Sequence, residues 1–146
     1  MIILDTHIWI WWVNSSSRLA DLHRSYINQH QPDGLGISLI SCWEVAKAVE
    51  SGRLGLSLPV QDWLESATAY PGVRRLDLTI PVIIESTQLT GFHRDPGDQL
   101  IVATSRILQS PLLTADFAIG DIVGYFSIIA IAAFISFRGY NDSSNR

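Results

Sequence analysis

The sequence predicts a single α/β domain in which helices cover both faces of a central, mostly parallel sheet. Short apolar runs typical of buried strands alternate along the chain with segments whose apolar residues recur at helical spacing. The chain has 146 residues, of which 47% are hydrophobic, and this is enough for one substantial core. No internal repeat or linker divides it.

Four apolar runs bounded by polar or turn-forming residues are expected to be the strands: 1–4, 35–40, 75–78 and 111–114. Helices are expected where apolar residues recur every three or four positions: 9–13, 18–29, 41–51, 59–70, 81–89 and 96–108. Ser41 and Glu44 have the spacing of a capping box at a helix start. Asp95 precedes Pro96, as expected of an N-cap before the first helical residue.

The charge balance argues against nucleic-acid binding by bulk electrostatics. The formal net charge is −4, from 14 acidic and 10 basic residues. Lys47 is the only lysine, and arginine mildly favours a phosphate-bearing partner because its guanidinium makes forked contacts. The single cysteine, Cys42, excludes an intrachain disulfide and a thiolate zinc site, which fits a reducing cytoplasm.

Four acidic residues are expected to gather at one edge of the sheet. Asp5 ends the first strand, Glu44 opens the helix after the second, Asp116 follows the fourth, and Asp98 lies in the first turn of helix 96–108. Ligands of open α/β sheets bind beyond the carboxyl ends of the strands, so these acids would share one crevice. Mg²⁺ or Mn²⁺ would relieve their repulsion and could activate water for attack on a phosphodiester.

Each acid also has a purely structural interpretation. Asp5 could cap the following helix, and Glu44 could be the reciprocal half of the capping box. Asp98 could merely favour the helix dipole, and Asp116 could be a turn residue. Taken alone, the structural role is the commoner one for Glu44 and Asp98. The position of all four acids at strand–helix junctions favours a shared site.

Four segments make the prediction more specific: residues 4–9 (LDTHIW), 40–46 (ISCWEVA), 93–101 (HRDPGDQLI) and 113–116 (LTAD). Together and in this order they resemble the PIN-domain family, most closely its VapC-type toxins of bacterial toxin–antitoxin pairs. The resemblance implies a PIN-like three-layer fold with a sheet of four to five short strands. It also implies a Mg²⁺- or Mn²⁺-dependent endoribonuclease, the toxin of a type II toxin–antitoxin system.

By motif, the residues that match the family's four catalytic and metal-binding acids are Asp5, Glu44, Asp98 and Asp116. Thr6 and Thr114 match polar neighbours that could orient a carboxylate or a metal-bound water. Asp95 matches the additional Asp of the D-P-x-D motif and is interpreted as a helix cap. Arg94, beside that motif, is the best single candidate for a phosphate contact with RNA.

The resemblance also implies partners: an RNA substrate, a VapB-like antitoxin and a second copy of the chain in a homodimer. The expected location is the bacterial cytoplasm, with no membrane association. Residues 1–121 are expected to form the PIN-like domain, and residues 122–146 a divergent apolar C-terminal segment that belongs to the same domain or to an interface. Its apolar run 122–137, roughly 16 residues, is shorter than the ~20 needed to span a bilayer.

This C-terminal segment leaves an alternative function open. The family usually continues from its fourth acid through a short loop into a final strand, whereas here the apolar run follows Asp116. The chain could therefore be a catalytically impaired PIN-like module that retains antitoxin binding. A phosphotransfer domain with Asp5 as nucleophile is disfavoured, because no second Asp follows it closely and no lysine lies near a late strand.

The tryptophans and arginines have two interpretations each. The tryptophans could stack on RNA bases, but core or dimer packing is favoured for Trp9, Trp11, Trp12, Trp43 and Trp63. The arginines could line an RNA path, but a role as solvated surface charges is favoured for Arg53, Arg74, Arg75, Arg94 and Arg106.

Overall fold

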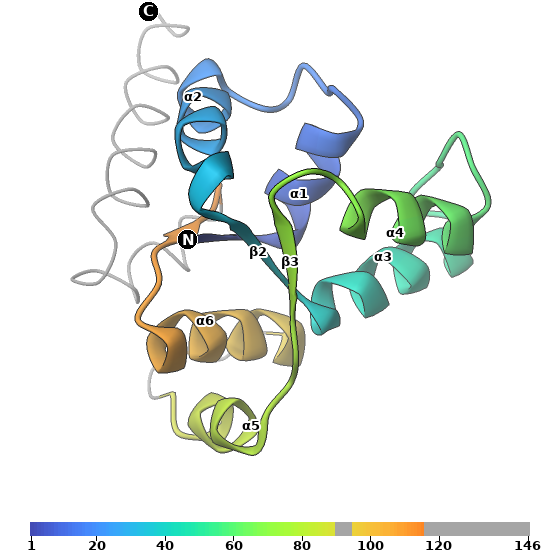
Figure 1. Ribbon diagram of the computed structural model, residues 1–146. Helices are drawn as coiled ribbons and strands as arrows, with labels where there is room; N and C mark the ends of the chain where they lie inside the picture. Colours follow the sequence, from blue (N-terminus) through green and yellow to red (C-terminus); the bar gives the residue numbers. More distant parts are fainter. Residues whose placement is uncertain (90–94, 116–146) are drawn as a thin grey trace, which may run out of the picture.

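The computed structural model describes residues 1–89 and 95–115 and shows a three-layer α/β/α arrangement (Figure 1). In this part of the chain, four short strands form one parallel sheet in the order β3-β2-β1-β4. They are β1 (Ile2–Leu4), β2 (Leu35–Ser38), β3 (Val73–Leu76) and β4 (Leu112–Leu113). The predicted fold class is confirmed.

Six α-helices connect the strands over the same residues: α1 (Thr6–Val13), α2 (Asp21–His30), α3 (Leu39–Glu50), α4 (Val60–Thr68), α5 (Ile80–Thr87) and α6 (Pro96–Leu108). A short 3-10 helix, η1 (Gln31–Asp33), leads from α2 into β2. Figure 1 shows α5 and α6 together on one side of the sheet, with α1 and α2 on the other.

The alternation of side chains along β1 divides the core between the two faces of the sheet. Ile2 and Leu4 belong to a cluster with buried residues of helices α1 to α4, whereas Ile3 packs with Ile101 and Val102 of α6. All three β1 residues are therefore buried. This explains why the strand is a continuous apolar run rather than an alternating one.

The order of the strands places a topological switch between β1 and β4. From β1 the sheet grows through β2 to β3 on one side, and the chain then returns to add β4 on the other side. Open α/β sheets bind ligands beyond the carboxyl ends of their strands at such a switch. Asp5 directly follows β1 and Thr114 directly follows β4, so the two residues lie at this position.

Helix α3 begins earlier than predicted, and the capping-box interpretation of Ser41 and Glu44 is wrong. Ser38 is the N-cap, and its side chain accepts a hydrogen bond from the Ile40 backbone over 3.3 Å. The β2 ladder ends at Ser38, because its partner β3 ends at Leu76 in the same register. Leu39 and Ile40, which follow Ser38, therefore belong to the helix. An apolar run alone does not distinguish a strand from a helix. Glu44 consequently lies in the second turn, beyond the capping positions.

Other boundaries shift by a few residues. Strand β3 covers Val73–Leu76 rather than 75–78, because the pairing of Val73 with Leu35 sets its register. Helix α1 begins directly after Asp5, and α2 begins at Asp21 rather than 18. No helix in residues 1–89 and 95–115 is long and apolar enough to cross a membrane. The apolar run 122–137 and the predicted domain boundary lie outside the described residues.

Candidate functional site

Asp5 is a buried carboxylate with a hydrogen bond at each oxygen. Its side chain is 4% exposed. Oδ1 accepts the backbone N–H of Thr6 and Oδ2 accepts the hydroxyl of Thr114, each over 2.8 Å. The backbone N–H of Asp5 also bonds the Leu113 carbonyl over 3.0 Å, which continues the pairing of β1 with β4. Asp5 does cap α1, but its side chain also bonds Thr114, the residue directly after β4, which capping does not require.

Thr6 links Asp5 to Glu44. Its hydroxyl lies 2.7 Å from Glu44 Oε1 and 2.9 Å from Ser41 Oγ. A hydroxyl has one proton to donate, and the short contact with a carboxylate takes it, so Ser41 donates to the Thr6 oxygen. The resulting chain of bonds from Ser41 through Thr6 to Glu44 orients the α3 carboxylate toward the first residue of α1.

Glu44 lies in a negative, partly desolvated environment. Burial raises the pKa of Glu44 most, and the charges of Asp5 and Asp95 raise it further, while the Thr6 hydrogen bond and His7 lower it. The three carboxylates therefore repel one another in the absence of a cation. A bound divalent cation would reverse this effect, because it favours the ionised form of every carboxylate near it.

The first turn of α6 packs against Glu44. Asp95 is the N-cap, as predicted, and its Oδ1 accepts the Gly97 N–H over 2.8 Å. A Cβ atom at Gly97 would lie 2.9 Å from Glu44 Cδ and 3.0 Å from its Oε2, so this approach requires glycine. Asp98 is half-buried in the same turn. The helix thus brings its acids to the end of the sheet where Glu44 lies.

The structure brings together part of the predicted set. Asp5 and Glu44 share Thr6, and the α6 turn that carries Asp98 packs on Glu44, whereas Asp116 and Arg94 lie outside the described residues. Within residues 1–89 and 95–115, no group of three or more His, Cys, Asp or Glu side chains is arranged to hold a metal ion. The carboxylate and hydroxyl oxygens that do meet are the donors that Mg²⁺ and Mn²⁺ prefer. They fit such a cation as part of a site.

Two residues with a structural role at this site were not identified from the sequence. The sequence pattern predicts a helix cap at Ser41, but the residue is fully buried and hydrogen-bonded to Thr6. Gly97 was not singled out, although a glycine inside a first helical turn weakens the helix and so indicates a close approach.

A cleft of about 430 Å³ opens beside Thr6 and Glu44. Helix α1 lines it with His7, Ile10 and Trp11, and α3 with Trp43, Lys47 and Ala48. Three residues that follow these two helices complete the lining together with Asp95: Arg18, Arg53 and Leu54. The cleft therefore leads from the carboxylates to positively charged and aromatic side chains.

Comparison with known proteins gives one family and several similar chains. The PIN domain family matches residues 2–124. Ribonuclease VapC22 of Mycobacterium tuberculosis is 33% identical over 105 residues, which cover 71% of this chain and 78% of that protein.

Solved structures with a similar fold have lower sequence identity. VapBC2 from Rickettsia felis, bound to a DNA fragment from its promoter, has a TM-score of 0.64 and 17% identity, covering 88% of this chain and 96% of that chain. A toxin–antitoxin complex from Klebsiella pneumoniae has a TM-score of 0.56 and 18% identity, covering 80% of this chain and 87% of that chain. At this identity the structural likeness concerns the fold.

Proposed function

Since this chain belongs to the PIN-domain family, and within it to the VapC-type toxins, we propose that it is a Mg²⁺- or Mn²⁺-dependent endoribonuclease. It would hydrolyse RNA phosphodiester bonds at a site formed by Asp5, Glu44, Asp98 and Asp116. The similar protein from Mycobacterium tuberculosis is named a ribonuclease, which supports this activity.

The observation that carries the proposal is the pair of hydrogen bonds made by Thr6. Its backbone N–H holds Asp5 Oδ1 and its hydroxyl holds Glu44 Oε1. One residue thus orients two carboxylates that come from different elements and repel each other. A helix cap alone would not require the second carboxylate, so the arrangement supports a cation-binding role.

The chain's own residues have distinct parts in the proposed reaction. Asp5 and Glu44 would hold the cation, which would supply a polarised water and stabilise the charge that develops on the phosphate. Thr6 and Thr114 keep the Asp5 carboxylate from rotating, because each bonds a different oxygen. Burial of Asp5 excludes bulk water from that side of the site, which strengthens electrostatic contacts there.

The test is cleavage of a mixed pool of structured RNAs by the purified protein with Mg²⁺, with Mn²⁺ and with chelator. We expect cleavage only with metal and none by Asp5→Asn, whose amide oxygen can accept from Thr6 and whose NH2 can donate to the Thr114 hydroxyl oxygen, but which lacks the negative charge. Asp62→Asn, an exposed position on α4, is the matched control and should cleave like the unaltered protein. Cleavage by Asp5→Asn equal to that of the control would reject the site.

The proposed partners of this toxin are a VapB-like antitoxin and a second copy of the chain. Support comes from the similar structures, which are described as VapBC2 and as a toxin–antitoxin complex. Co-purification with the antitoxin and the mass of the isolated chain in solution test both. Tight antitoxin binding by a folded protein that cuts no RNA would favour the impaired module instead.

A further inference from the structure

The cleft beside Thr6 and Glu44 joins the carboxylates to side chains that the proposed hydrolysis does not use. Among its lining are two tryptophans and three cationic residues: Trp11, Trp43, Arg18, Lys47 and Arg53. Two carboxylates, Glu44 and Asp95, line the same cleft, so the three cations leave it one net positive charge in a chain whose formal net charge is −4. This complements an anionic ligand.

The positive charges continue away from the carboxylates along α3. Lys47 and Ala48 follow Glu44 by three and four residues, so all three lie on one side of the helix. With the rise of an α-helix, Lys47 is about 4.5 Å further along the axis than Glu44. Arg53 comes after the end of α3 and Arg18 after the end of α1. An extended anionic ligand that reaches from the carboxylates through the cleft would therefore lie near cationic side chains from both helices' ends.

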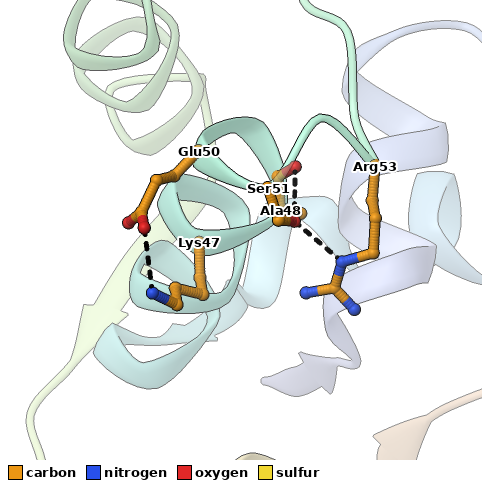
Figure 2. A network of polar contacts seen from close by, with 5 residues as sticks. All are labelled: Lys47, Ala48, Glu50, Ser51 and Arg53. Atoms are coloured by element: carbon orange, nitrogen blue, oxygen red, sulfur yellow. Dashed lines mark hydrogen bonds and ion pairs between the residues drawn. The ribbon is translucent and has the colours of Figure 1, made fainter.

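Two of these cations are available to a ligand (Figure 2). Arg53 donates through Nε to Ser51 Oγ over 2.9 Å, and Ser51 in turn bonds the Ala48 carbonyl over 3.2 Å. This orients the guanidinium while both terminal nitrogens point away from Ser51. Lys47 pairs with Glu50 over 3.1 Å, but both side chains are exposed, so the pair is weak and is easily exchanged for a phosphate.

Trp43 differs from the tryptophans of the core. Trp9 and Trp63 are buried and pack edge to face with ring centroids 5.2 Å apart, as core packing predicts. Trp43 is 57% exposed and directly precedes Glu44 in the sequence. Trp43 and Glu44 both line the cleft, so the indole presents an aromatic surface to solvent beside the carboxylates. Of the predicted core or dimer packing, the core packing is wrong for Trp43, and the dimer packing stays a prediction.

We infer that this cleft binds single-stranded RNA next to the scissile phosphate, with a base stacked on Trp43 and the following phosphates paired with Lys47 and Arg53. The inference rests on the proposed ribonuclease function. Stacking on an aromatic side chain accepts any base, and guanidinium makes forked contacts with phosphate. A volume of about 430 Å³ suits a small ligand such as one nucleotide. A duplex would keep its bases stacked inside and away from the indole.

The test is the binding of a labelled, mixed-sequence single-stranded RNA of about ten nucleotides in chelator, where metal-dependent cleavage is absent. We expect Trp43→Ala to weaken binding about tenfold and Trp43→Phe to retain most of the affinity, because the phenyl ring still stacks. Arg53→Ala should lower the slope of log affinity against log salt by about 0.7, the value for one phosphate contact on a single strand. Arg75→Ala, an exposed arginine on β3 outside the cleft, should change neither quantity.

Affinity and salt slope that stay unchanged in both Trp43→Ala and Arg53→Ala would overturn the inference. Both residues are exposed, so these variants should keep the fold, and thermal melting checks this. The cleavage assay separates the two proposals. If the variants bind RNA more weakly but the unaltered protein cleaves no RNA, the ribonuclease function alone is overturned. If the unaltered protein cleaves RNA and the variants keep its RNA affinity and its KM, the proposed RNA cleft alone is overturned. The cleft would then be a binding site for a peptide.

Discussion

Thr114 donates its hydroxyl to Asp5 Oδ2 over 2.8 Å, across the position between β1 and β4 where the strand order reverses. Both residues are buried, and they are 109 positions apart in the sequence. The bond therefore holds the Asp5 carboxylate to the residue that directly follows β4, the last of the described strands in the sequence.

Thr114→Val, which replaces the hydroxyl with a methyl of similar size, should impair both stability and cleavage. A hydrogen bond to a charged group contributes roughly 1.5–3 kcal/mol, and the carboxylate also loses a fixed orientation. Urea denaturation measures the first effect and metal-dependent RNA cleavage the second. Thr114→Ser restores the hydroxyl and should recover most of the cleavage. Equal losses in the Ser and Val variants would show that the hydroxyl is not the important group.

Glu44→Gln should raise the melting temperature at neutral pH in chelator. Folding raises the pKa of Glu44, so the protonated form is favoured in the native state, and stability falls as pH rises through that pKa. At neutral pH the ionised side chain is destabilising, and the neutral amide removes this effect while it still accepts from Thr6. The advantage should disappear at a pH below the ordinary Glu range.

The Glu44→Gln variant also tests whether Glu44 takes part in binding the cation. Mg²⁺ should stabilise the unaltered protein by about 2.7 kcal/mol at 100 times its dissociation constant, and Glu44→Gln by much less. Glu65→Gln, at an exposed position on α4, is the control and should match the unaltered protein with and without Mg²⁺. Equal Mg²⁺ stabilisation of Glu44→Gln and the control would remove Glu44 from the cation site.

Gly97→Ala should separate activity from stability. The new Cβ would lie 2.9 Å from Glu44 Cδ and 3.2 Å from Asp95 Oδ1, and the flexible carboxylate of Glu44 is the group that can move. Alanine favours the helix by up to about 1 kcal/mol, which offsets the strain, so denaturation should change little. Cleavage should fall by about 10- to 100-fold, as for other changes that disturb the support of a metal ligand.

Gly55→Ala is the matched control for this variant. A Cβ at Gly55 meets no described atom within 4 Å, so both stability and cleavage should stay unchanged. Full cleavage by Gly97→Ala would mean that the Glu44 carboxylate accommodates the methyl group without losing its function.

The contribution of His23 to the stability of the protein should fall as the pH drops below about 6.5. His23 is 3% exposed, and within the described part of the chain neither of its ring nitrogens has a hydrogen-bond partner. Burial lowers the pKa of His23, so the unfolded state takes up a proton before the native state does. Stability is therefore retained above the unfolded pKa and lost as the pH falls through it, by at most about 1.4 kcal/mol per pH unit.

His23→Leu should flatten this dependence between pH 7 and pH 5, as measured by urea denaturation. His30→Gln is a suitable control, because His30 is half-buried and bonds the Tyr26 carbonyl over 2.8 Å. An equally steep fall of stability in His23→Leu would assign the dependence to other groups.

The sequence by itself determined the fold class and most elements, because hydrophobic periodicity and helix caps are local properties. The run that ends at Asp5 predicted a buried strand, and Asp95 before Pro96 predicted the N-cap of α6. The order of the motifs also identified the family. The strand before Asp5 and the cap of α6 depend on neighbours within a few residues, and both form where the sequence predicts them.

Only the tertiary structure decided which groups Glu44 and Gly97 contact and whether Trp43 is exposed. Pairing with β3 sets the end of β2, and this moved the start of α3 and excluded Glu44 from a capping box. Thr6 and Gly97 meet Glu44 only because α1 and α6 pack against α3. Trp9 and Trp43 both lie on helices, yet one is buried and the other exposed, because burial depends on partners supplied by distant parts of the chain.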